Sequence, residues 1–147
     1  MVPILLDTSI LIYFIDPRDK GRQEQAIEVL TRLGDNDSGH LSVQNLAEFM
    51  NASYKLADHV QLQEVVNQVN RWVNTYTVFD LTSMVIFEAI RGVRVHKLAY
   101  YDAQIWATAR LNQVPVIFSE DFQDRQILDG VRFVNPFSDH FDITEWQ

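Results

Sequence analysis

The sequence contains no cysteine among its 147 residues. This absence excludes disulfide scaffolds, thiolate metal sites and cysteine nucleophiles. Long apolar runs are also missing, because no window approaches the roughly 18 uninterrupted apolar residues of a membrane span. The apolar start, Met1 to Leu6, is too short for the core of a signal peptide and lacks the basic residues that precede one. We therefore expect a protein of the cytoplasm that does not associate with a membrane.

Basic residues are scarce in this chain. Twelve Lys and Arg stand against 20 Asp and Glu, so the net charge is −8. This balance argues against nucleic acid as a partner, since affinity for phosphate backbones usually comes from Lys and Arg. Binding of RNA would need a local group of cations, and one precedes residue 102: Arg91, Arg94, His96 and Lys97. A simpler interpretation is that these cations end a helix, where positive charge favours the helix dipole.

The remaining composition is typical of a globular protein, with 47% hydrophobic and 22% charged residues. We find no internal repeat and no linker, so residues 1–147 are interpreted as a single domain. A chain of this length buries about two-thirds of its unfolded surface in one core. The last segment, 136–147, carries scattered apolar residues and is expected to pack on the body as a C-terminal tail.

Short apolar runs alternate with segments of helical periodicity. The apolar runs predict strands at 2–6, 40–43, 75–79, 114–118 and 131–134, and the periodic segments predict helices at 10–15, 26–33, 44–57, 62–73, 82–95 and 100–112. This alternation predicts a three-layer α/β/α fold, because parallel strands need crossover connections. Its central, mostly parallel sheet should have about five strands. In such sheets the functional crevice lies outside the carboxyl ends of the strands.

Acidic side chains occur where that crevice should be. Asp7 directly follows the first strand, and Asp121 lies just after the fourth. Asp102 stands in the first turn of a helix, and Glu48 stands one turn into another. A doubly wound sheet would bring all four to one edge. Carboxylates gathered there without basic partners should bind a hard divalent cation, Mg²⁺ or Mn²⁺.

Each acid alone also has a simpler explanation. Asp7 can cap the helix that follows it, Asp102 can favour the dipole of its own helix, and Asp121 can form a turn. Glu48 points away from the helix face that we expect to be buried, which would place it in solvent. That face carries Val43, Leu46, Met50 and Ser53. Only the arrangement of the four acids favours a metal site.

At these residues the sequence resembles the PIN-domain nucleases, and especially the VapC-type toxins of prokaryotic toxin–antitoxin pairs. The resemblance runs from LLDTSILIYF to VRFVNPF. The motifs LLDTSILIY, QNLAEFMN, YYDAQIWATA and FSEDFQD are similar to the family segments that carry its metal-binding acids. The resemblance therefore implies that Asp7, Glu48, Asp102 and Asp121 are catalytic metal ligands. It overrides the solvent-facing interpretation of Glu48.

The same resemblance implies hydrolysis of RNA phosphodiester bonds with one or two Mg²⁺ or Mn²⁺ ions. A held ion would activate a water and neutralise charge on the phosphate. Ser9 and Ser119 fall where the family commonly has a small polar residue, and Glu120 and Asp124 are further supporting candidates. Arg125 stands where close relatives often have glycine, which bears on the conformation of the acidic loop.

The resemblance also implies partners. They are an RNA substrate, a cognate antitoxin protein, and a second copy of the chain in a homodimer. From the charge pattern we expect Arg91, Arg94 and Lys97 to hold the RNA weakly. A hypothesis of a different class stays open, in which the chain is a catalytically silent PIN-fold module that binds protein or RNA. Silent members tend to lose acids, whereas this chain has an acid at all four matching positions.

The motifs of two other protein classes, a receiver domain and a phosphatase, are missing from this chain. A phosphoacceptor receiver domain needs an acidic pair after its first strand and a lysine after a late strand. Here one acid follows the first strand, and Ser119 and Glu120 follow Phe118. A haloacid-dehalogenase-type phosphatase needs an aspartate two positions after its nucleophile, where this chain has Ser9.

Overall fold

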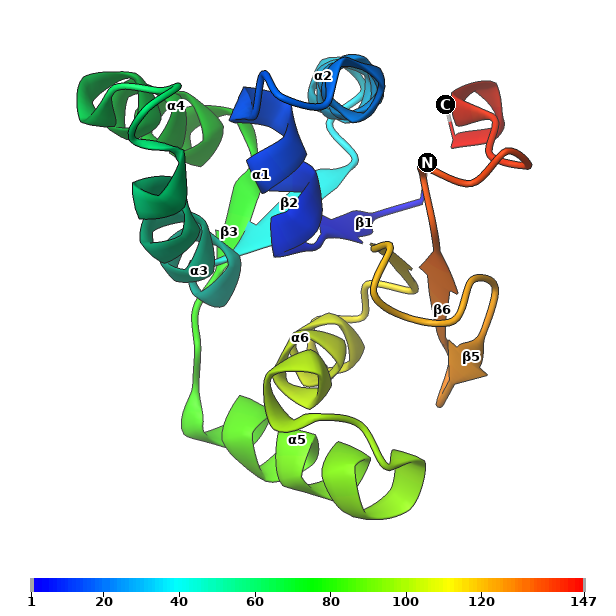
Figure 1. The fold of residues 1–147 in the computed structure, drawn as a ribbon. Coiled ribbons are helices and arrows are strands. Elements are labelled where there is room, and N and C mark those ends of the chain that lie inside the picture. Colours follow the sequence, from blue (N-terminus) through cyan, green and yellow to red (C-terminus); the bar gives the residue numbers. More distant parts are fainter. Residues whose placement is uncertain (1, 147) are drawn as a thin grey trace.

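The structure, a computed structural model, describes residues 2–146. Over that part of the chain, six strands form one sheet with helices on both faces (Figure 1). The strands are β1 (Ile4–Leu6), β2 (Gly39–Ser42), β3 (Thr77–Phe79), β4 (Val116–Phe118), β5 (Ile127–Leu128) and β6 (Val131–Val134). The helices are α1 (Thr8–Ile15), α2 (Lys20–Asp35), α3 (Val43–Ser53), α4 (Leu62–Thr75), α5 (Ser83–His96) and α6 (Tyr100–Leu111), with short 3-10 helices η1 (Tyr54–Leu56) and η2 (Ile143–Trp146).

The sheet has the strand order β3-β2-β1-β4-β6-β5. All neighbouring strands are parallel except β5, which pairs antiparallel with β6. The predicted α/β/α architecture with a mostly parallel sheet is therefore confirmed, with a sixth strand beyond the five expected. The extra strand β5 has two residues and belongs to a tight hairpin, so it offers no apolar run from which to predict it.

The core lies in two layers, one on each face of the sheet. Ile4 and Leu6 pack among the residues of α1 to α4, whereas Leu5 packs against α5 and α6. All three are fully buried. A strand buried on both faces reads as an uninterrupted apolar run, and this explains the sequence pattern that ends at Asp7.

Capping residues fix where the helices leave the sheet. The Ser42 hydroxyl accepts a hydrogen bond from the Asn45 N–H (3.1 Å), and the Asn45 side-chain oxygen accepts one from the Ser42 N–H (3.2 Å). This reciprocal pair starts α3 directly at the end of β2. Thr82 caps α5 by accepting from the Val85 N–H. Glu48 therefore lies one turn beyond the carboxyl end of β2.

The buried face of α3 is rotated relative to the predicted one, although Ser53 is buried and Leu46 and Met50 pack partly buried against the core. Val43 is 36% exposed, whereas Gln44, Asn45 and Phe49 are buried. The prediction failed because it followed apolar residues, while two of the buried residues are amides that satisfy their hydrogen bonds inside the protein. This rotation of the helix brings Glu48 to the border of the buried face.

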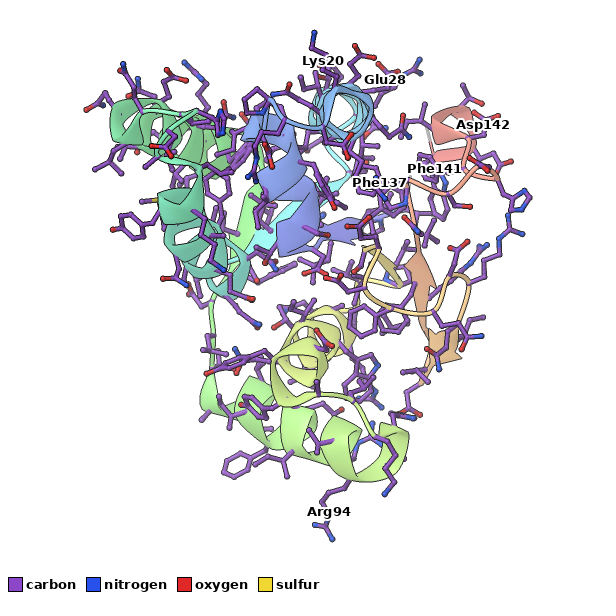
Figure 2. All side chains as sticks on the ribbon, viewed as in Figure 1. Lys20, Glu28, Arg94, Phe137, Phe141 and Asp142 are labelled. Carbon is purple, nitrogen blue, oxygen red and sulfur yellow. The ribbon has the colours of Figure 1, made fainter. Side chains whose placement is uncertain are left out.

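The C-terminal segment packs on the layer that contains α1 and α2. Figure 2 shows Phe137 and Phe141 on this segment, and both contact the core of that layer. Phe141 meets the ring of Phe118 edge-on at 5.4 Å, and Phe137 meets Tyr13 at 5.1 Å. Within residues 2–146, no helix has both the length and the apolar character needed to cross a membrane.

Candidate functional site

Asp7 lies at the junction of β1, α1 and β4. Its carboxylate accepts hydrogen bonds from the Ser119 hydroxyl (2.6 Å) and from the Thr8 N–H (2.7 Å), and its side chain is almost completely buried. Burial raises the pKa of Asp7 from 3.8 to about 7, although the hydrogen bonds from Ser119 and Thr8 lower it in part. Asp7 caps α1, as the simpler interpretation had it, but a cap alone does not require a buried carboxylate.

Glu48 and Asp121 lie close enough to interact with Asp7, and Asp102 lies close enough to interact with Glu48 and Asp121. Burial is the main cause that raises the pKa of Glu48, Asp102 and Asp121. Repulsion between them adds to it: Asp102 and Asp121 raise the pKa of Glu48, and Asp121 raises the pKa of Asp102. Glu48 and Asp121 likewise raise that of Asp7. The structure thus brings the predicted acids together, and we call these four residues the acid rim.

The acid rim has no positive partner in the described chain. None of the ion pairs formed by residues 2–146 includes a member of it. Over the same residues, no three Asp, Glu or His side chains converge closely enough to hold a metal ion as they stand. The rim offers only oxygen donors and its charge is uncompensated, and both features suit a hard cation. Its side chains would have to rotate to coordinate one. The Ser9 hydroxyl, two residues after Asp7, is buried and lacks a hydrogen-bond partner among the described residues.

Residues on α1 and α3 support the rim. The Asn45 amide donates to the Thr8 hydroxyl (3.2 Å), and a hydrogen bond with Thr8 lowers the pKa of Glu48. The Gln44 amide donates to Glu48 at 2.8 Å. Neither amide was predicted as a site residue from the sequence. The signal that would have found them is a pair of polar residues, Gln44 and Asn45, on the buried stripe of α3.

The loop after β4 holds the supporting residues predicted for the site. The Ser119 hydroxyl donates to Asp7 and also accepts from the Asp121 N–H (3.1 Å), so it joins two members of the rim. Glu120 turns toward α1 and α2, where it accepts from the Tyr13 hydroxyl (2.6 Å) and the Arg22 guanidinium (3.3 Å). Burial and Glu120 together raise the pKa of Tyr13 to about 12.

Two residues farther along this loop serve its shape. The Asp124 carboxylate accepts from the Asn135 N–H (2.8 Å), which fastens the loop to the end of β6. Arg125 adopts a left-handed backbone with φ of 66°. Glycine takes that conformation most easily, which agrees with the glycine that the family resemblance implies for this position.

The cations predicted for RNA binding lie at α5. Arg91 pairs with Glu88 and with Asp129 (2.9 Å), whereas Arg94 projects from α5 away from the body (Figure 2). The Lys97 ammonium donates to the Arg94 carbonyl at 3.0 Å. Arg91 belongs to a group of matched charges that we call the paired cluster: Glu88, Arg91, His96, Arg110 and Asp129.

Comparisons with known proteins agree with the fold. A family model for the PIN domain matches residues 4–141. A toxin–antitoxin complex from Klebsiella pneumoniae shares the fold with a TM-score of 0.67 and 20% identity, over 90% of this chain and 97% of that chain. VapC20 from Mycobacterium tuberculosis, a sarcin–ricin loop cleaving toxin, gives 0.65 and 20%, over 88% of this chain and 98% of its own.

DNA-bound VapBC from Salmonella typhimurium gives a TM-score of 0.63 and 19% identity, over 90% of this chain and 97% of that chain. None of the curated proteins matches the chain in sequence. At 19 to 20% identity the solved structures show only that the fold is shared, and membership in a family rests on the family model. Because that model spans nearly the whole chain, this protein belongs to the PIN domain family.

Proposed function

We propose that this protein is a metal-dependent endoribonuclease and the toxin of a toxin–antitoxin pair. The observation that carries the proposal is the acid rim: carboxylates at one edge of a PIN fold, each with its pKa raised and none with a cation in the described chain. The structural neighbours support the toxin assignment. One is a toxin–antitoxin complex, and another is a toxin that cleaves the sarcin–ricin loop.

Asp7, Glu48, Asp102 and Asp121 would hold one or two Mg²⁺ or Mn²⁺ ions. A bound ion would lower the pKa of a water molecule and neutralise charge on the scissile phosphate. The chain's own contribution is orientation, because Ser119 and Thr8 fix both oxygens of Asp7 before any ion arrives. With its pKa near 7, the Asp7 carboxyl is part protonated at neutral pH, and it would give up that proton as the ion binds.

Partners follow from the same proposal. The substrate is RNA, and a cognate antitoxin would restrain the enzyme in the cytoplasm. We also propose a homodimer, which the apolar outer surface of α5 supports: Met84 is 64% exposed and Phe87 is 67% exposed. Exposed side chains of this size, side by side on one helix, are typical of surfaces that a protein covers.

A catalytically silent binding module is the alternative. It is disfavoured because acids remain at every position of the rim and because their burial without a cation destabilises the metal-free fold. A module without metal chemistry would gain stability by losing Asp7.

The test is RNA cleavage by purified, antitoxin-free protein in Mg²⁺, Mn²⁺ or EDTA. Asp7→Asn is compared with Asp129→Asn, which removes an acid that lies in the paired cluster. We expect cleavage to vanish in EDTA, to fall by about 100-fold or more in Asp7→Asn, and to survive in Asp129→Asn. Equal cleavage by the wild type and Asp7→Asn would refute the proposal. Failure of the wild type to cut diverse RNAs or to bind Mn²⁺ would favour the silent module.

A further inference from the structure

Two buried amides connect the helices that carry Glu48 and Asp102. Gln104 on α6 donates to the Gln44 side-chain oxygen at 2.9 Å. The Gln44 amide nitrogen in turn donates to Glu48 (2.8 Å) and to the Tyr101 carbonyl (3.0 Å). Gln44 is 7% exposed and Gln104 is 3% exposed. No other hydrogen bond joins α3 to α6 in the part of the chain that the structure describes.

The direction of these hydrogen bonds is forced by their partners. An ionised carboxylate and a backbone carbonyl can only accept, so the Gln44 nitrogen must face Glu48 and Tyr101. Its oxygen then has to face Gln104, which supplies the donor. Both N–H groups of Gln44 and its oxygen are thereby used. A shorter or apolar side chain could not make the same contacts.

Burying the amides of Gln44 and Gln104 carries a desolvation cost, so we expect the network to have a function. An apolar pair could fill the space between two helices without the desolvation penalty that a buried amide carries. Fully satisfied polar networks do, however, fix geometry more narrowly than apolar packing does. The network ends on Glu48 and on the carbonyl directly before Asp102, and it is therefore directed at two members of the acid rim.

We infer that Gln44, supported by Gln104, is a positioning residue that sets Glu48 relative to Asp102 for metal binding. This inference rests on the proposed function. It goes further than the four acids because it assigns a role to residues that carry no charge and touch no substrate. Gln44 holds one Glu48 oxygen in place and links it to the first turn of α6, so the two acids approach the ion in a fixed relation.

The test substitutes Gln44→Met, which keeps the length of the side chain and removes every hydrogen bond that it makes. Gln44 lines an open cavity of about 530 Å³, so the methionine has room. The matched control is Gln68→Met, because Gln68 is a buried glutamine on α4 with 8% exposure. The probe is Mn²⁺ alone, titrated calorimetrically into the protein without RNA.

We expect Gln44→Met to weaken Mn²⁺ binding by about 10-fold, as is common when a group that orients a metal ligand is lost. Gln68→Met should leave the affinity unchanged. In RNA cleavage the loss in Gln44→Met should shrink as Mn²⁺ is raised, with KM for RNA unaltered. In a Glu48→Gln background Gln44→Met should add almost nothing, because its effect passes through Glu48.

An unchanged Mn²⁺ affinity in a folded Gln44→Met protein overturns the inference and leaves the proposed nuclease intact. Wild-type protein that neither binds Mn²⁺ nor cuts RNA overturns both. If Gln44→Met does not fold, Gln104→Leu takes its place, since it removes only the support for Gln44. There a roughly 3-fold weaker affinity supports the inference, and an unchanged affinity contradicts it.

Discussion

The acid rim and the paired cluster both contain aspartate and glutamate, but only the paired cluster also supplies cations beside them. In the paired cluster, Glu88 is matched by Arg91 and Arg110, and Asp129 by Arg91 and His96. Hydrogen bonds from His96 and Arg91 lower the pKa of Asp129. In the rim every pKa is raised instead. The charges of the paired cluster are balanced by other residues of the chain, whereas no ion pair within residues 2–146 balances the charge of the rim.

The largest difference between the two regions should appear in the free energy of unfolding when one acid in each is neutralised. The folded pKa of Asp7, about 7, lies above its unfolded value of 3.8, so the folded state binds more protons between these values. Metal-free stability therefore falls as pH rises from about 4 to 7. Above that range Asp7→Asn should raise the free energy of unfolding by up to about 4 kcal/mol, and near pH 4 by almost nothing.

Urea unfolding in EDTA at about pH 4 and pH 8 measures this effect. Asp129→Asn is the control, and it should destabilise the protein at the higher pH, because the pKa of Asp129 is lowered in the folded state. An Asp7→Asn protein that is less stable than the wild type at pH 8 without metal would show that the Asp7 carboxylate is compensated after all.

Added metal should compensate the charge of the acid rim, which the paired cluster already achieves with its own cations. Mn²⁺ at about 100 times its dissociation constant should stabilise the wild type by about 2.7 kcal/mol. Thermal unfolding near pH 8 measures the shift in melting temperature. Asp121→Asn removes one rim carboxylate and should shrink the shift, whereas Asp129→Asn should preserve it. An equal shift in both variants would place the ion outside the rim.

Much of the fold follows from the sequence. The alternation of apolar runs and helical segments predicted the parallel sheet, and each predicted strand was found within a few residues of its place. The short β5 was missed because its pairing depends on a hairpin and not on hydrophobicity. The buried face of α3 was wrong for a similar reason: hydrophobic periodicity gives no weight to Gln44 and Asn45, which are buried through hydrogen bonds.

The site residues also divide into those that the sequence predicts and those that it does not. Asp7 stood out because it directly follows a strongly apolar strand, and the structure buries it. Glu48 depended on the family resemblance, since its helix wheel placed it in solvent. The contacts of Glu120 with Tyr13 and Arg22 join segments roughly one hundred residues apart, and no local pattern predicts them. Side-chain contacts between segments far apart in the chain cannot be predicted from local sequence patterns.

A smaller effect should come from the paired cluster itself. Glu88 accepts hydrogen bonds from Arg91 and Arg110, and its side chain is 12% exposed. Glu88→Gln removes the charge but keeps the shape, so we expect a loss of about 1 kcal/mol. Urea unfolding should give the same loss with and without Mn²⁺. A loss that depends on Mn²⁺ would mean that the two regions are coupled.

The smallest effect should come from Asp129→Asn, about 0.5 kcal/mol at neutral pH, because Asp129 is more exposed than Glu88 and solvent screens its pairs. Its lowered pKa fixes the sign: the stabilisation is present above the unfolded value and is lost as pH falls through the lower folded value. Salt near 1 M should reduce it further. Asp139→Asn, at an exposed acid outside both regions, should change nothing. If Asp129→Asn instead stabilised the protein at neutral pH, as Asp7→Asn is expected to do, Asp129 would be unpaired. The electrostatic distinction between the paired cluster and the acid rim would then fail.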